Sequence, residues 1–524
     1  MAGMSLVVGC TEKTAGAGHS ATDAIALPAN GETAVVVRID PTKTGSVIGE
    51  DFSGVSFEMR MVREGRDGSH FFDAADKELV AMFRSLGIHS LRVGGNSLDS
   101  ATGNGATEAD IDSLFGFAKA ANLKVIYSVR MKDINTPEQI ADDVRQVKYL
   151  WSKYADLTTS VTIGNEPNIY FADTAPGGVG TAPAAGPAPI KTAVLGGVGD
   201  SGAVGIGYAA YRKQWEKIAG AIVKESPDVR LCGPSSTPGK VAWAGAFARD
   251  EGKGPFAKNL ALITQHSYPG GNAQKVTDSG AGRELILSNK MEENYEKFYN
   301  TFATSAIDNQ KPYRLEESNS LFHGGATNIS NTAASALWGL DFMWWWAQHG
   351  AAGINFHTGM NSAPAGRTPG GYDLFWDSPD GIQVHPMGYA AKTFDIPGHG
   401  VFLKTDITNA SNLNLTTYAI RRLDARGDLF VTIINRENVN GNTGGHDAAV
   451  TLDVGNGTWH AQEMFLKQDK NDLAATGGMT LGGATINKDG SWKGEWTNAA
   501  AAGTGKFLIH VKAGEAAIVR LARN

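Results

Sequence analysis

The sequence predicts a (β/α)8 barrel of the TIM type, followed by a β-sandwich domain. From about residue 52 to 400, short apolar runs alternate with amphipathic helical stretches, which is typical of repeated βα units around a parallel sheet. After about residue 400 the helical period disappears, and short alternating runs predict antiparallel strands. A chain of 524 residues also exceeds what one compact core usually fills, so a large domain with an accessory module is expected.

Residues 1–31 are predicted to form a leader and a flexible tail. The segment LVVGC, which ends at Cys10, resembles the end of a bacterial lipoprotein signal, in which that cysteine would carry a lipid anchor. The apolar stretch before it is short for a complete signal, so a chance apolar leader is the alternative. With a lipid anchor, the protein would be secreted, periplasmic or attached to the outer surface of a bacterial cell.

Residues 32–50 are predicted to contribute strands to the C-terminal sandwich. The run TAVVVRID is rich in β-branched residues, a turn is expected from Pro41 to Gly45, and a second strand is expected to begin near residue 47. These strands have no partner within a closed barrel. We therefore expect them to pair with the sandwich formed by residues 401–524, which would make the barrel an insertion between them.

Residues 51–400 are predicted to form the barrel, because eight strand candidates can be counted. Active sites of such barrels are built at the carboxyl ends of the strands, so chemistry is expected there. The candidates are FSGVSF (52–57), HSLRVGG (89–95), KVIYSVR (124–130), TSVTIGNE (159–166), VRLCGPS (229–235), LALITQHSY (260–268), YRLEES (313–318) and GINFHTG (353–359).

One long segment, residues 172–206, interrupts this rhythm and is unusually rich in Gly, Ala and Pro. A loop of this length is normally functional or disordered. It directly follows the fourth strand candidate, so it would overhang the carboxyl ends of the strands. We expect a wall or lid of the cleft, with disorder as the alternative.

Composition excludes several classes of protein. The net charge of -7 and the pI near 6.0 argue against a protein that wraps nucleic acid, whose surface would be basic. No apolar run approaches the roughly 18 residues that cross a bilayer, so no membrane span is expected. The two cysteines, Cys10 and Cys232, are not expected to be catalytic, and a disulfide between them would be geometrically arbitrary.

Carboxylates stand at the ends of two strand candidates. Glu166 follows an apolar run and precedes Pro167, which ends the strand, and Glu316 and Glu317 lie in YRLEES. Strand alternation predicts that Glu317 faces the barrel mouth and that Glu316 faces the helices. Cleavage of a glycosidic bond with retention needs one carboxyl that donates a proton and one that attacks the sugar. The sequence therefore offers the two carboxyls that such a site requires, with a surface ion pair as the alternative for either one.

The sequence around these carboxylates resembles glycoside hydrolase family 79. Asn165-Glu166-Pro167 and Glu317-Ser318-Asn319-Ser320 are similar to the acid/base and nucleophile motifs of this β-glucuronidase and heparanase family, which belongs to the clan A barrel glycosidases. The resemblance covers most of the barrel and the flanking sandwich. It implies that Glu166 protonates the leaving group and that Glu317 forms the glycosyl-enzyme intermediate. It extends through residues 92–96, 164–168, 266–268, 313–325, 334–339 and 353–357.

The resemblance also implies supporting roles for residues near the carboxylates. Arg92 and Tyr268 would hold and orient Glu317, and Asn165 would bind the sugar 2-hydroxyl. Glu58 would bind a sugar hydroxyl, with a rim ion pair to Arg60 as the alternative. Further candidates for substrate binding are Asn96, Asp99 and His266.

A uronate carboxylate would be bound, by the same resemblance, through a Gly-Gly turn and tyrosine hydroxyls. Gly324 and Gly325 supply the turn, and Tyr372 supplies one hydroxyl. Phe322 stands where a bacterial glucuronidase relative has tyrosine. A missing donor weakens carboxylate binding, so a neutral glycone is the alternative, unless His323 compensates as a cation.

No cofactor and no metal are expected. The histidines are scattered, without carboxylates or cysteines at metal-ligand spacing, and the glycine-rich stretches lack a phosphate-binding fingerprint. The hypothesis is therefore a retaining exo-β-glycosidase with a carbohydrate substrate, hydrolysing terminal β-glucuronides. The alternatives are a retaining β-glycosidase for a neutral glycone and a non-catalytic carbohydrate-binding lipoprotein.

Overall fold

The computed structural model describes residues 31–99, 105–134, 136–170, 206–358, 371–378, 380–441 and 443–523. The predicted leader with Cys10 lies outside the described residues. The predicted loop 172–206 also lies outside them, apart from Ile206. Within the described ranges, no helix combines the length and the apolar character that crossing a bilayer requires.

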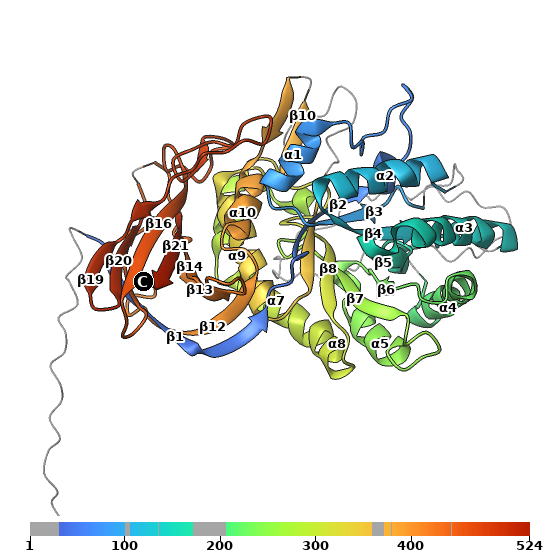
Figure 1. The fold of residues 1–524 in the computed structure, drawn as a ribbon, viewed down its shortest axis with the longest axis horizontal. Helices are drawn as coiled ribbons and strands as arrows, with labels where there is room; N and C mark the ends of the chain where they lie inside the picture. The colour runs from blue at the N-terminus through green and yellow to red at the C-terminus, as the bar shows by residue number, and fades with distance from the viewer. Residues whose placement is uncertain are drawn as a thin grey trace, which may run out of the picture.

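Eight parallel strands close into a barrel, which confirms the predicted fold class (Figure 1). Each strand coincides with one of the eight candidates from the sequence. The strands are β2 (Ser53–Glu58), β3 (Ser90–Gly94), β4 (Lys124–Val129), β5 (Thr158–Ile163), β6 (Leu231–Pro234), β7 (Leu260–Ser267), β8 (Tyr313–Ser318) and β9 (Gly353–His357).

Helices surround this barrel, and their ends carry the expected capping residues. Thr107 and Thr136 form capping boxes with the third residue of the helices that follow. The main helices are α1 (Lys77–Ser85), α2 (Glu108–Ala121), α3 (Pro137–Tyr154), α4 (Tyr208–Glu225), α5 (Ala242–Glu251), α6 (Ser279–Leu287), α7 (Lys290–Phe298), α8 (Thr304–Asp308), α9 (Ala333–Gln348) and α10 (Pro386–Asp395).

A second, curled sheet of 11 strands lies beside the barrel. The core of this sheet is a separate apolar cluster that includes Val37, Val431 and Val519. A separate hairpin of β10 (Phe375–Ser378) and β11 (Gly381–Val384) follows the last barrel strand in the chain. The strands of the curled sheet are β1 (Thr33–Val47), β12 (Gly400–Thr408), β13 (Leu415–Arg422), β14 (Leu429–Asn435), β15 (Ala448–Asp453), β16 (Trp459–Gln468), β17 (Met479–Leu481), β18 (Thr497–Asn498), β19 (Ala500–Gly503), β20 (Lys506–Val511) and β21 (Ala516–Arg523).

The N-terminal strand β1 joins this sheet, as the sequence predicts, between β12 and β15. The predicted turn from Pro41 to Gly45 is wrong, because β1 runs without a break from Thr33 to Val47. Strand β1 instead shifts its register against β12 twice after Asp40. Proline has no backbone N–H to donate, and a residue in such a bulge does not need one, so Pro41 is accommodated within the strand. The strands expected as a sandwich of two sheets belong to one continuous curled sheet.

Helices α9 and α10 lie between the barrel and the curled sheet (Figure 1). Asp341 on α9 accepts hydrogen bonds from Tyr418 and Thr416 on β13, at 2.8 and 2.7 Å. Arg436 donates to the same carboxylate at 2.8 Å. Both members of this ion pair are 2% exposed, so a buried polar network holds the two parts of the chain together.

Candidate active site

The structure brings Glu166 and Glu317 together at the carboxyl ends of the barrel strands. Glu166 follows β5 and Glu317 lies on β8, and two strands separate these in the barrel order. A carboxylate oxygen of Glu166 and one of Glu317 lie no more than 4.8 Å apart. Their side chains are 15% and 9% exposed, so both are largely shielded and still open to solvent.

The backbone at Glu166 has a left-handed conformation, with φ 47° and ψ 51°. Such a conformation is uncommon for a residue other than glycine and is concentrated at functional sites. The Glu166 N–H donates to the Ser235 carbonyl at 3.0 Å, and Pro167 begins a short 3-10 turn. This turn directs the Glu166 side chain to the barrel mouth.

Glu317 is held ionised by the groups around it. Arg92 Nη1 donates to Glu317 Oε2 at 2.7 Å, and the Tyr268 hydroxyl donates to Oε1 at 2.9 Å. Burial by itself would raise the pKa of Glu317, but the charges of His266, His357 and Arg92 keep that pKa well below its usual range. The Glu317 carboxylate is therefore available as a nucleophile at neutral pH.

His266 lies between the carboxylates. Its Nδ1 is 3.0 Å from Glu166 Oε1 and 3.6 Å from Glu317 Oε1, and its Nε2 is 3.7 Å from Glu316 Oε1. Burial would lower the pKa of His266, but these three carboxylates raise it to about 9. His266 is therefore an imidazolium at neutral pH, and it bridges the two carboxylates as a cation.

The predicted orientation of Glu316 is wrong, because both Glu316 and Glu317 face the barrel interior. Thr162 on β5 donates to Glu316 Oε2 at 3.0 Å, and this contact crosses the interior because β5 and β8 are not neighbours. A bulge on β8 is the cause: Gln265 pairs with Leu315, while His266 pairs with Glu317. The extra residue breaks the alternation of side chains, and Glu316 becomes fully buried beside His266.

Arg92 links Glu317 to Asn165. Its Nη2 donates to Asn165 Oδ1 at 2.7 Å, so the Asn165 amide group is oriented with its NH2 outward, where it donates to Asn96 Oδ1 at 3.2 Å. Gly94 makes room for this arginine, since a Cβ on Gly94 would lie 2.5 Å from Arg92 Cζ. The predicted supporting residue and the two predicted asparagines thus form one network.

Asp99 has an internal role in this region. Both Met131 and Lys132 donate backbone N–H groups to its Oδ1, and the Tyr170 hydroxyl donates to its Oδ2. The same Tyr170 hydroxyl accepts the Asn165 N–H at 2.9 Å. Tyr170 was not predicted, although it follows Glu166 by only four residues, and it connects the loops after three strands.

Glu58 lies beside His357 and not in the ion pair with Arg60 considered above. His357 Nε2 is 3.6 Å from Glu58 Oε1, and the Ser97 N–H donates to Glu58 Oε2 at 2.7 Å. Burial would raise the pKa of Glu58, but the hydrogen bond and charge of His357 and the bonds from Ser97 lower it to about 2. Glu58 is therefore an acceptor for hydroxyl donors at the site.

The remaining predicted residues lie on loops beside the carboxylates. Gly324 and Gly325 have φ of 83° and 82°, a left-handed conformation that favours glycine. A Cβ on Gly325 would lie 3.1 Å from the Tyr372 ring. The Tyr268 ring centroid is 6.2 Å from those of both Tyr372 and Phe322. The predicted turn, tyrosine and phenylalanine therefore lie on the same side as Tyr268.

No family model matches the chain. Two curated proteins, both named beta-glucuronidase, are similar to parts of it. The protein from Aspergillus niger is 34% identical over 110 residues, which make up 20% of each chain. The protein from Neurospora crassa is 30% identical over 167 residues, 29% of each chain. The matched segments thus span less than a third of either relative.

Solved structures match nearly the whole chain in fold. A 4-O-α-L-rhamnosyl-β-D-glucuronidase from Fusarium oxysporum 12S has a TM-score of 0.65 at 16% identity, covering 92% of this chain and 99% of its own. A family 51 arabinofuranosidase from Xanthomonas axonopodis pv. citri has a TM-score of 0.62 at 12% identity, covering 94% and 100%. The architecture of this chain, a barrel with a second β domain, is shared with these glycosidases.

Proposed function

We propose that this chain is a retaining exo-β-glycosidase that hydrolyses terminal β-glucuronides and belongs to glycoside hydrolase family 79. One observation carries the proposal: oxygens of Glu166 and Glu317 lie within 4.8 Å of each other at the barrel mouth. An oxygen–oxygen separation of at most 4.8 Å is compatible with the roughly 5–5.5 Å between the carboxyls of retaining enzymes, and it is shorter than the roughly 6.5–9.5 Å of inverting ones. The partial similarity to two beta-glucuronidases supports the substrate class.

The proposed reaction proceeds by two displacements. Glu317 attacks the anomeric carbon while Glu166 gives its proton to the glycosidic oxygen, so the C–O bond breaks and a glycosyl ester forms. Glu166, now a carboxylate, takes a proton from water, which attacks the anomeric carbon and releases Glu317. The contacts of Arg92 and Tyr268 hold Glu317 in its charged form before the first step.

The sugar hydroxyls are proposed to bind on both sides of this pair. The Asn165 amide group, whose orientation Arg92 sets, would donate to the 2-hydroxyl, where hydrogen bonds strengthen in the transition state. Glu58 would accept from a further hydroxyl on the other side of the barrel axis. A uronate carboxylate would lie near Tyr268, Tyr372 and the N–H groups of Gly324 and Gly325.

A neutral glycone is the second candidate, favoured by Phe322. Its ring lies edge-on to Tyr268 with the centroids 6.2 Å apart, and it brings no hydroxyl to this side of the site. A site that lacks a donor discriminates less strongly in favour of a carboxylate.

We also propose that the protein is exported and anchored by a lipid at Cys10, and this proposal rests on the LVVGC segment alone. With such an anchor, a non-catalytic carbohydrate-binding lipoprotein is a third candidate for the function.

The test compares hydrolysis of an aryl β-glucuronide and an aryl β-glucoside by the full chain. We expect the glucuronide to be preferred and proton NMR to detect the β-anomer first, because two displacements retain configuration. Glu166→Gln and Glu317→Gln should each lower kcat/KM on the order of 10³-fold. The exposed Glu293→Gln serves as the matched control. Initial release of the α-anomer, or full activity of Glu317→Gln, would refute the mechanism, whereas preference for the glucoside would select the neutral glycone.

A further inference from the structure

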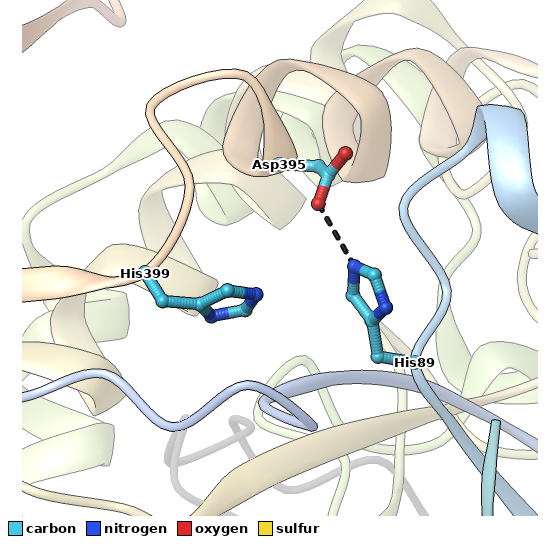
Figure 2. Close-up of side chains that lie close together, drawn as sticks. All are labelled: His89, Asp395 and His399. Carbon is cyan, nitrogen blue, oxygen red and sulfur yellow. Dashed lines mark hydrogen bonds and ion pairs between the residues drawn. The ribbon is translucent and has the colours of Figure 1, made fainter. Parts of the chain in front are cut away.

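A second cluster of ligating side chains lies far from the active site. His89, Asp395 and His399 each offer one nitrogen or oxygen atom, and these atoms all lie within 4.8 Å of one another. His89 Nε2 is 3.0 Å from Asp395 Oδ1. The side chains of His89 and Asp395 are 26% and 24% exposed, so solvent and ions have access. Figure 2 shows the His399 ring directed toward the gap beside the other two side chains.

This cluster lies at the amino ends of the barrel strands, opposite the catalytic carboxylates. His89 immediately precedes β3, its N–H donates to the Ser53 carbonyl at the start of β2, and its carbonyl accepts from Lys124 at the start of β4. Asp395 ends α10 and His399 immediately precedes β12. Residues on this face of a barrel contribute to stability and not to catalysis.

Two connections between the barrel and the curled sheet pass through this region. The chain passes from β1 to β2 through residues 48–52 and from α10 to β12 through residues 396–399. The Ile48 N–H donates to the Gly400 carbonyl at 2.8 Å, so these connections lie side by side. A group bound to His89, Asp395 and His399 would therefore link the barrel to the segment that enters the sheet.

The local backbone leaves room for the three side chains to converge. Gly87 has φ +66°, and a Cβ there would lie 2.2 Å from both Cβ and Cγ of Asp395. Only glycine allows this close approach. Gly398 has φ +71°, and its N–H donates to the Asp395 carbonyl at 2.8 Å. This tight turn places His399 beside the end of α10.

The His399 imidazole is available as a ligand. Its ring lies beside the Gly49 backbone, and its Nδ1 is buried without a hydrogen-bond partner of good geometry in the described part of the chain. Neutral imidazole is the form that binds metals, and two imidazoles with one carboxylate are a ligand set for zinc and related divalent ions.

We propose that His89, Asp395 and His399 bind one divalent transition-metal ion, zinc in the first place, which fastens the barrel to the connection that enters the curled sheet. Three protein ligands leave a fourth position of a tetrahedral site for water. Ligand atoms roughly 2.0–2.2 Å from a tetrahedral zinc ion are about 3.4 Å from one another. The separations here are 3.0 Å between His89 and Asp395 and no more than 4.8 Å to His399, so side-chain rotations can bring the three atoms around one ion. The proposal is independent of the glycosidase activity.

The experiment titrates zinc into the EDTA-treated full chain by calorimetry and follows thermal unfolding at each zinc concentration. We expect one zinc per chain and a melting temperature that rises with zinc, because an ion that binds the folded chain stabilises it. His399→Gln should weaken binding about tenfold or more and abolish the shift of the melting temperature. Cobalt(II) in place of zinc should give the visible bands of a tetrahedral site in the wild type only.

Two controls locate the ion. One control is His460→Gln, at an exposed histidine on β16. The other is Glu166→Gln, in the second group with metal-compatible geometry among the described residues. Both variants should bind zinc like the wild type. If His399→Gln does not fold, Asp395→Asn replaces it, since it keeps an acceptor for His89. The proposal would be overturned if zinc binding survives His399→Gln or Asp395→Asn, if it is lost in Glu166→Gln, or if it never saturates. The cluster would then be a plain His89–Asp395 ion pair.

Discussion

Replacing Glu316 with glutamine should lower the pH at which His266 loses its proton. Glu316 is fully buried, and its Oε1 is 3.7 Å from His266 Nε2. The pKa of Glu316 is lowered, against the effect of burial, by the His266 hydrogen bond and by the charge of Arg92, so the carboxylate is ionised. Glutamine has the same shape and removes only the charge that supports the imidazolium.

The size of the effect follows from this distance. Two unit charges 3.7 Å apart interact by about 4 kcal/mol at an effective dielectric constant of about 20. A pKa change of one corresponds to about 1.4 kcal/mol, so the whole interaction would lower the pKa of His266, about 9 in the wild type, by about three. The glutamine dipole offsets part of this, and we expect a decrease between about one and three.

The same protonation contributes to stability. The pKa of His266 is raised from 6.5 in a free side chain to about 9 in the folded chain, which corresponds to about 3 kcal/mol. A raised pKa stabilises the folded state fully below pH 6.5, and this contribution is lost as the pH rises through about 9. In Glu316→Gln, the loss should occur at lower pH.

The assay is NMR of 15N-labelled histidine across pH 5 to 10, with denaturant unfolding and aryl glycoside hydrolysis measured at the same pH values. The alkaline limb of kcat/KM should move with the His266 titration in Glu316→Gln, and the exposed Glu293→Gln should leave it in place. If His266 titrates near pH 6.5 in the wild type, or if its titration does not change in Glu316→Gln, the reasoning is refuted.

Three further substitutions test the site and the scaffold. Tyr268→Phe removes one hydrogen bond to ionised Glu317, so kcat/KM should fall by about 10- to 100-fold, the equivalent of a charged hydrogen bond. Gly94→Ala places a methyl group 2.5 Å from Arg92 Cζ, and we expect a loss of about 1–3 kcal/mol in unfolding free energy together with at least tenfold lower kcat/KM. Asp341→Ala breaks a buried ion pair, so denaturant unfolding should show a loss of about 3–5 kcal/mol.

Each of these substitutions has a matched control in the chain. Tyr154→Phe, on α3, should leave kcat/KM unchanged. Gly116→Ala lies within α2 with open space around the added methyl, so it should stabilise the chain by about 0.5–1 kcal/mol. Asp308→Ala, at an exposed aspartate, should have little effect on unfolding. Equal effects in a test variant and its control would contradict the assigned contact.

The sequence by itself determined the barrel and the place of the two carboxylates that we propose as catalytic. All eight strands could be located because short apolar runs alternate with amphipathic helices, and this periodicity is a local property. Glu166 and Glu317 follow such runs, and parallel strands present their carboxyl ends at one face of the barrel. The two residues therefore had to approach each other, even though 151 positions of the chain separate them.

Only the tertiary structure decided how the groups around those carboxylates face. Glu316 turns inward because β8 holds an extra residue relative to both neighbouring strands, and a bulge depends on pairing that a single strand does not encode. The charge of His266 on β7 depends on three carboxylates, one that follows β5 and two on β8. His89 and Asp395, 306 positions apart, meet only because the chain leaves the barrel beside the place where it entered. Contacts of this kind arise from closure of the barrel and docking of the sheet, and no local sequence pattern carries them.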